Sequence, residues 1–110
     1  MRVLTFIVED ETITLDPTCD LAGLFPGSEE QIQAEFVFSP EWKNRLKVAA
    51  FWSVMDKEYE PKVINDDNTC LIPEEALSKV AFKVQVLGKR RNNPIVKTNT
   101  VTIKQSGRKR

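Results

Sequence analysis

Histidine is absent from the 110 residues of this chain. Its absence removes the most common general base, the Ser–His and Cys–His nucleophile pairs, and the most common zinc ligand. The chain also lacks a phosphate-binding loop, a dinucleotide fingerprint and a Gly-x-Ser-x-Gly motif. Ser28 follows Gly27 but has no base that could activate it. We therefore expect no enzymatic activity, no metal ion and no cofactor.

Long apolar runs are absent too, and cysteine is scarce. The N-terminal apolar stretch, residues 3–8, is interrupted by Glu9-Asp10-Glu11 and is too short for a signal peptide. No segment approaches the roughly 18 apolar residues of a membrane helix. We therefore expect synthesis in the cytosol, with Cys19 and Cys70 as free thiols and Cys70 buried. A disulfide between two sheets is the alternative.

The formal net charge is zero, but the charges are divided along the chain. Residues 1–75 contain all 16 acidic residues and six basic ones, which gives 6 − 16 = −10. Residues 76–110 contain ten basic residues and no acidic residue, which gives +10. This division predicts a charged partner, a basic tail or self-complementary association. The alternative is that the fold interleaves the two segments and mixes the charges on the surface.

Apolar residues recur with a period of two, which is typical of half-buried β-strands. Strands are expected at residues 3–8, 13–15, 31–38, 46–53, 69–72, 80–86 and 98–105. The clearest inward sets are Ile32, Ala34, Phe36 and Phe38 in one strand, and Val80, Phe82, Val84 and Val86 in another. The 46–53 strand is apolar on both faces and is placed centrally. In the last strand we expect the threonines to face outward.

The segments between these strands carry turn signals. Ser39-Pro40-Glu41-Trp42 and Pro73–Leu77 each predict a single helical turn, because proline fits the first helical position. Residues 88–94 predict a hairpin loop. The chain is therefore predicted to be all-β, an Ig-like antiparallel two-sheet β-sandwich of about seven strands, with a small barrel as the alternative. We expect one domain over residues 1–105 and a basic tail over residues 106–110.

Basic residues form two clusters that are candidates for a partner interface. They are Lys89, Arg90 and Arg91 in the predicted hairpin loop, and Arg108, Lys109 and Arg110 at the end of the chain. Pairing with acidic protein surface is the first interpretation. Contact with a phosphate backbone is the alternative. No aromatic residue follows Phe82, so we expect no base-stacking platform.

Two tryptophans need separate interpretations. Trp52 shares a strand face with Val48 and Ala50, and we expect it in the core. Trp42 follows a polar turn and is either a lid on the sandwich or an anchor at an interface, so it joins the candidate interface residues.

A longer ordered set of motifs carries a family resemblance. The set comprises Phe36-x-Phe38-Ser39-Pro40-Glu41-Trp42, Leu46–Phe51, Cys70-Leu71-Ile72-Pro73-Glu74-Glu75-Ala76-Leu77, Phe82-Lys83-Val84-x-Val86-x-Gly88 and Ile95-x-x-Thr98-Asn99-x-Val101-x-Ile103. Over residues 30–105 this order is similar to that of small β-sandwich proteins of tailed bacteriophages. They include capsid decoration and head-fibre modules, and the N-terminal domains of baseplate and receptor-binding proteins. The Lys89-Arg90-Arg91 loop is not part of the resemblance.

The resemblance implies a structural protein of the virion, made in the host cytoplasm, that decorates the outer capsid surface. Its partners would be the major capsid protein or other virion proteins, with self-association on the capsid, and it would have no membrane or small-molecule partner. The chain ends five residues after its last predicted strand, which favours a decoration subunit over a fibre domain. The alternatives are a tail or baseplate accessory subunit and a nucleic-acid-binding module.

Overall fold

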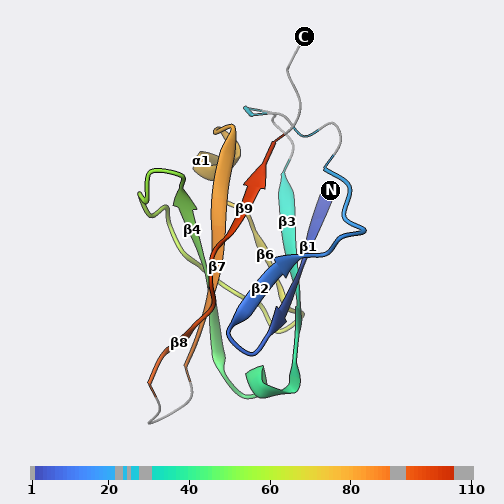
Figure 1. Cartoon of the computed structure of the whole chain (residues 1–110), viewed down its shortest axis with the longest axis vertical. Helices are drawn as coiled ribbons and strands as arrows, with labels where there is room; N and C mark the ends of the chain where they lie inside the picture. Colours follow the sequence, from blue (N-terminus) through green and yellow to red (C-terminus); the bar gives the residue numbers. More distant parts are fainter. Residues whose placement is uncertain (1, 22–23, 25, 28–30, 90–93, 106–110) are drawn as a thin grey trace.

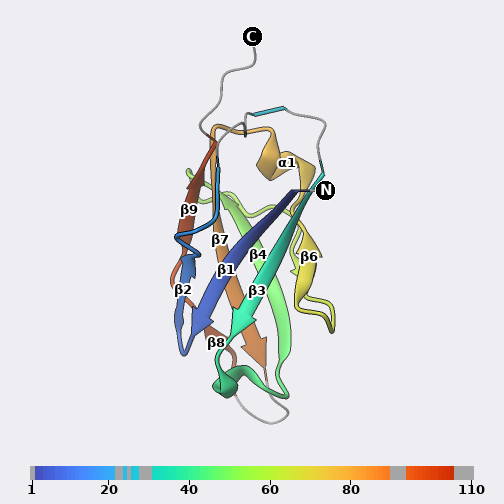
Figure 2. The same cartoon turned by 90° about the vertical axis from the view of Figure 1, so that its right-hand side faces the viewer.

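A computed structural model describes residues 2–21, 24, 26–27, 31–89 and 94–105, which form two packed β-sheets (Figures 1 and 2). The first sheet has the order β2-β1-β3-β6, with β1 (Arg2–Glu9), β2 (Thr12–Leu15), β3 (Ile32–Phe38) and β6 (Thr69–Leu71). The second has the order β5-β4-β7-β8, with β5 (Lys62–Val63), β4 (Leu46–Ser53), β7 (Ala81–Lys89) and β8 (Val96–Lys97), and β9 (Val101–Lys104) also pairs with β7. The predicted all-β sandwich is confirmed, with nine strands in the described residues instead of about seven.

One strand pair corrects the prediction of an antiparallel fold. β1 and β3 run parallel, from the pair Arg2–Ile32 to the pair Val8–Phe38. The reason is that β2 turns back along β1 and ends opposite Phe6, and Asp16 continues in this direction with its N–H bonded to the Thr5 carbonyl oxygen (2.9 Å). A parallel neighbour needs a long connection, and residues 16–31 provide it before β3 begins.

Along the described strands the chain crosses between the sheets three times: from β3 to β4, from β5 to β6 and from β6 to β7. The first and the last of these crossings contain single helical turns, both predicted from the sequence. A 3-10 turn, η1 (Pro40–Trp42), joins β3 to β4, and a short helix, α1 (Glu74–Leu77), joins β6 to β7. Pro40 is the first residue of η1. Proline suits this position because the N–H of a first helical residue has no partner within the helix, so the lack of an N–H in proline costs no hydrogen bond. These crossings put β3 and β6 in one sheet and β4, β7 and β9 in the other, which is the connectivity of an Ig-like sandwich.

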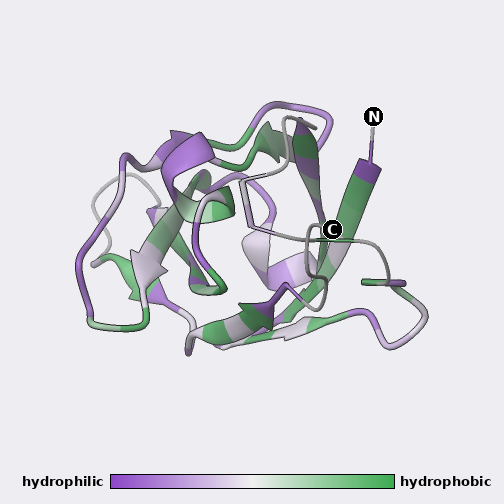
Figure 3. Ribbon diagram, turned by 90° about the horizontal axis from the view of Figure 1, so that it is seen from above, coloured by the Kyte–Doolittle hydropathy of each residue, from purple (hydrophilic) through white to green (hydrophobic). Residues whose placement is uncertain are grey.

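The core lies between the two sheets and follows the period-two pattern. Seen from above, hydrophobic and hydrophilic bands alternate along the strands (Figure 3). The expected inward residues Ile32, Ala34 and Phe36 are buried, and the Phe36 ring stacks on that of Phe6 with 5.5 Å between centroids. Each aromatic ring buried in this way removes a large apolar area from water, which is the main contribution to the stability of the sandwich.

Three positions differ from the sequence prediction. Val80 is 69% exposed because β7 begins one residue later, at Ala81. Gly88 lies within β7 and not in a loop. Thr98 is buried, because its hydroxyl accepts a hydrogen bond from the backbone N–H of Val86 (3.1 Å) and so belongs to the sheet interior.

Trp52 also differs from the prediction. Its cross-strand partner is Lys83, on the outer side of the second sheet, whereas the neighbouring pair Phe51–Val84 faces the core. The Trp52 side chain is therefore half-buried and lies outside the core. The prediction failed because β4 is apolar on both sides, so its composition does not distinguish the inner face from the outer one.

Trp42 closes the end of the sandwich where β3 crosses to β4. Its side chain is fully buried, and its indole N–H donates a hydrogen bond to the carbonyl oxygen of Asp10 (2.8 Å). The Phe38 ring lies 5.5 Å away, and the Arg45 guanidinium lies 5.1 Å from the indole centroid. Trp42 is therefore a lid on the sandwich, and the expectation that it anchors an interface is corrected.

The two long open sides of the sandwich are built differently. On the side where β2 faces β9, the Asn99 side chain bonds the backbone of Ile13 twice. Its Oδ1 accepts from the Ile13 N–H (2.8 Å), and its Nδ2 donates to the Ile13 carbonyl (3.2 Å). The opposite side, between the edge strands β5 and β6, contains a groove below α1.

We predict that Gly88→Ala destabilises the protein because Gly88 lies directly under the Trp42 ring. A Cβ at position 88 would lie 2.9 Å from Trp42 Cε3 and 3.2 Å from Arg45 Cδ, and closer still to Trp42 Cζ3. Overpacking of this kind costs about 1–3 kcal/mol. Urea denaturation measures the loss.

Trp42→Phe provides the matched test of this contact. The smaller ring leaves room for the added methyl group, so the double variant loses less stability than the sum of the two single variants. Strict additivity would show that the Trp42 ring is not what requires glycine at position 88.

Candidate binding surface

The sequence-predicted interface residues are only partly described by the structure. Lys89 is exposed at the end of β7, and Trp42 is buried as the lid. Arg90, Arg91, Arg108, Lys109 and Arg110 lie outside the described residues. Whether the two predicted basic clusters act together therefore remains a prediction.

A basic surface that the sequence analysis missed lies on the outer face of the second sheet, here called the basic face. Core residues alternate along β7 and β9, and the register places the intervening lysines on the opposite side of the sheet. The lysines of this face are Lys83, Lys89, Lys97 and Lys104. The signal that could have found them is the period-two alternation: each lysine takes an outward position in a strand whose inward positions hold apolar residues or glycine.

An apolar cluster shares the basic face. Val63, Val48 and Leu87 lie side by side across β5, β4 and β7, and Leu46 lies two residues from Val48 on the same side. Leu46 and Val63 are 63% and 62% exposed, respectively. Lys97 pairs with Leu87 and Lys89 pairs with Leu46, so ammonium groups border the cluster. An exposed apolar centre with a charged border is typical of a protein-binding surface.

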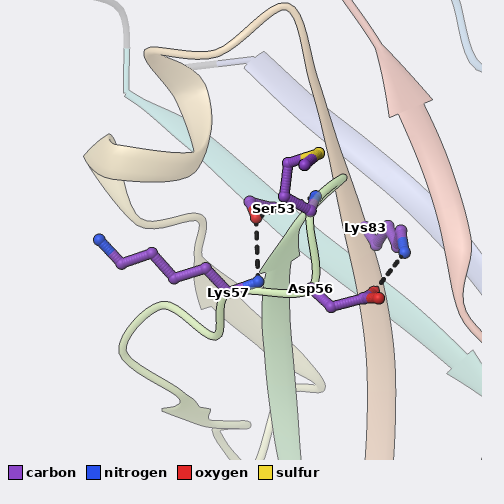
Figure 4. A network of polar contacts seen from close by, with 5 residues as sticks. Ser53, Asp56, Lys57 and Lys83 are labelled. Atoms are coloured by element: carbon purple, nitrogen blue, oxygen red, sulfur yellow. Dashed lines mark hydrogen bonds and ion pairs between the residues drawn. The ribbon is translucent and has the colours of Figure 1, made fainter.

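The acidic residues near this face come from one loop. Asp56 Oδ1 accepts a hydrogen bond from Lys83 Nζ at 2.7 Å, as Figure 4 shows, and Glu58 lies beside Trp52. Ser53 Oγ holds this loop by accepting the backbone N–H of Lys57 (3.0 Å). No ion pair is recorded for Lys89, Lys97 or Lys104 with the described part of the chain. Three of the four lysines therefore keep their charge available to a partner.

The outer face of the first sheet carries the opposite sign. Outward positions of β1 and β3 hold Glu9 and Glu35, and no outward strand position of this sheet holds lysine or arginine. Ile7 and Val37 lie side by side between them. Within the described residues, the outward strand positions of the two sheets thus carry charges of opposite sign.

The carboxyl group of Asp10, in the turn between β1 and β2, interacts with that of Glu41 in η1. The Asp10 pKa is raised by its hydrogen bond with Glu41 and by the negative charge of Glu41. The Glu41 pKa is lowered by hydrogen bonds from Ser39 and from backbone N–H. Within the described ranges, no group of three His, Cys, Asp or Glu residues is arranged to hold a metal ion.

No protein-family model, curated protein or solved structure matches this chain. The helical segments of the described residues, η1 and α1, are far shorter than a bilayer-spanning helix.

The two thiols are predicted to differ in reactivity. Both are free, Cys70 is buried on β6 and Cys19 is half-buried. Burial raises the pKa of Cys70 to about 12, so its reactive thiolate is scarce at neutral pH. We expect a thiol reagent to label Cys19 rapidly in the folded protein and Cys70 only after unfolding.

Cys19→Ser is the control for this labelling. The rapid phase should disappear in that variant, and the thiol exposed by denaturant should remain. Equal rates for both thiols in the folded protein would contradict the burial of Cys70.

Proposed function

We propose that this protein is a structural protein of a phage virion that decorates the outside of the capsid. The ordered motifs over residues 30–105 support the phage assignment by their resemblance. The basic face supports an adhesive role, because the exposed Lys89 and Lys97 border an apolar cluster there. This face is the observation that carries the proposal.

The two parts of the basic face have different roles in this adhesion. Lys89, Lys97 and Lys104 attract an acidic capsid surface and speed the encounter. Leu46 and Val63 then leave water on contact and slow dissociation. Many weak copies of such a contact on one lattice give strong overall attachment. The acidic outer face of the first sheet remains available to neighbouring subunits.

Two alternatives use the same surface. A tail or baseplate accessory subunit would adhere by the same contacts at another place in the virion. A nucleic-acid-binding module would use the lysines alone, with Trp52 next to Lys83 as its aromatic residue. Asp56 and Glu58 flank Trp52 and would repel phosphates there, so the protein partner is favoured.

We predict that reversing the charge of the basic face weakens attachment to purified capsids that lack this protein. The triple variant Lys89→Glu, Lys97→Glu and Lys104→Glu should bind at least about tenfold more weakly, because each lysine that faced an acidic surface becomes repulsive. Added salt should weaken the wild type and have less effect on the variant. Sedimentation of capsids with bound protein measures both effects.

Matched variants separate the possible partners. Lys57→Glu is the charge control, because Lys57 extends away from Lys83 (Figure 4). The pair Leu46→Ser and Val63→Ser should weaken capsid binding while leaving any DNA or RNA retained on a filter unchanged. Undiminished capsid binding by both the triple variant and this pair would exclude the basic face as the adhesive surface.

A further inference from the structure

A groove of about 720 Å³ lies on the open side of the sandwich between β5 and β6, below α1. Its wall includes Tyr59, Glu60, Leu71, Glu74 and Glu75. The groove adjoins the basic face at β5, but its lining residues are different ones, and it plays no part in the proposed function. Its volume is in the range of pockets that hold small ligands or peptide side chains.

Tyr59 is the feature of the groove that lacks an explanation within the fold. Its side chain is 5% exposed, and its hydroxyl has no hydrogen-bond partner. Its backbone is fixed, because the Tyr59 N–H donates to the Phe51 carbonyl (2.8 Å). A buried hydroxyl without a partner destabilises the folded state, and phenylalanine would avoid that cost at this position. Because Tyr59 lines the groove, a donor on a ligand bound there would supply the partner that this hydroxyl lacks.

The charge of the groove selects a cationic ligand. Glu60, Glu74 and Glu75 contribute three carboxylates, and Lys62 is the basic residue among those that line the groove. Lys62 Nζ lies 3.7 Å from Glu60 Oε2, so this pair compensates itself and leaves Glu74 and Glu75. Within the described residues, neither Glu74 nor Glu75 forms an ion pair.

The edge strand on the groove favours an extended ligand. The bonds from Ile72 N–H to Ile32 O and from Phe36 N–H to Asn68 O fix the β3–β6 register. In that register the N–H and C=O groups of Leu71 point away from β3, toward the groove side of the sheet. A peptide in strand conformation can therefore pair with β6 at Leu71.

We propose that this groove binds an extended peptide segment that presents arginine. A guanidinium has five N–H donors in a planar fork, so it can bond the Tyr59 oxygen and a carboxylate of Glu74 or Glu75 together. A lysine ammonium group is a compact point charge, so it is less suited than a guanidinium to bond the Tyr59 oxygen and a carboxylate together. The site requires no cofactor and is independent of the capsid role.

The test uses a fluorescein-labelled probe, Thr-Arg-Val-Arg-Thr, with both ends blocked, and measures fluorescence anisotropy with the full chain. We expect saturable binding that weakens at least about tenfold in Tyr59→Phe, since a hydrogen bond to a charged group is lost. The double variant Glu74→Gln and Glu75→Gln should weaken it by a similar factor. Thr-Gln-Val-Gln-Thr, which lacks the guanidinium groups, should not bind.

Stability separates a ligand contact from a structural role. Tyr59→Phe removes an unpartnered hydroxyl, so its urea midpoint should equal or exceed that of the wild type while its probe affinity falls. The matched charge control is Glu9→Gln with Glu35→Gln, which removes two carboxylates from the first sheet's outer face and should leave probe affinity unchanged. The proposal is overturned if the arginine probe does not bind, if Tyr59→Phe binds it like the wild type, or if the control weakens binding as much as the groove variants.

Discussion

The packing of two sheets against one core is the constraint on which the rest of this structure depends. It requires every second strand residue to be apolar and directs the intervening residues outward. In β7 and β9 the inward residues Phe82, Val84 and Ile103 leave the lysines no position except the outer face. The charge surfaces of the molecule therefore follow from the burial of its apolar residues, and a shift of one residue in register would destroy both.

Local patterns made much of this fold predictable. The alternation through β3, the proline that begins η1 and the proline that precedes α1 act over a few residues, and the corresponding elements form where they were expected. Features that depend on distant residues were not predictable. The parallel pairing of β1 with β3 depends on the path of residues 16–31, and Gly88 is required by the ring of Trp42, which is far away in the chain.

The binding surfaces, too, are predictable where they depend on neighbouring residues and unpredictable where they depend on distant ones. Lys89 could be identified from its charge cluster, whereas Lys97 and Lys104 become part of one surface only when β8 and β9 both pair with β7. The groove is lined by both Tyr59 and Glu74, although the residues around Tyr59 carry no motif. The protein thus presents a basic face with an apolar centre and, on an open side, an acidic groove.

The most direct test of the proposed adhesion is an electron cryo-microscopy reconstruction of virions that carry the protein. The account predicts density for this β-sandwich on the outer capsid surface, with β4, β7 and β9 facing the capsid and β1 and β3 facing solvent or a neighbouring subunit. Density in which the first sheet contacts the capsid while the lysines of the basic face are exposed to solvent would contradict it. Density confined to the tail would contradict the capsid assignment.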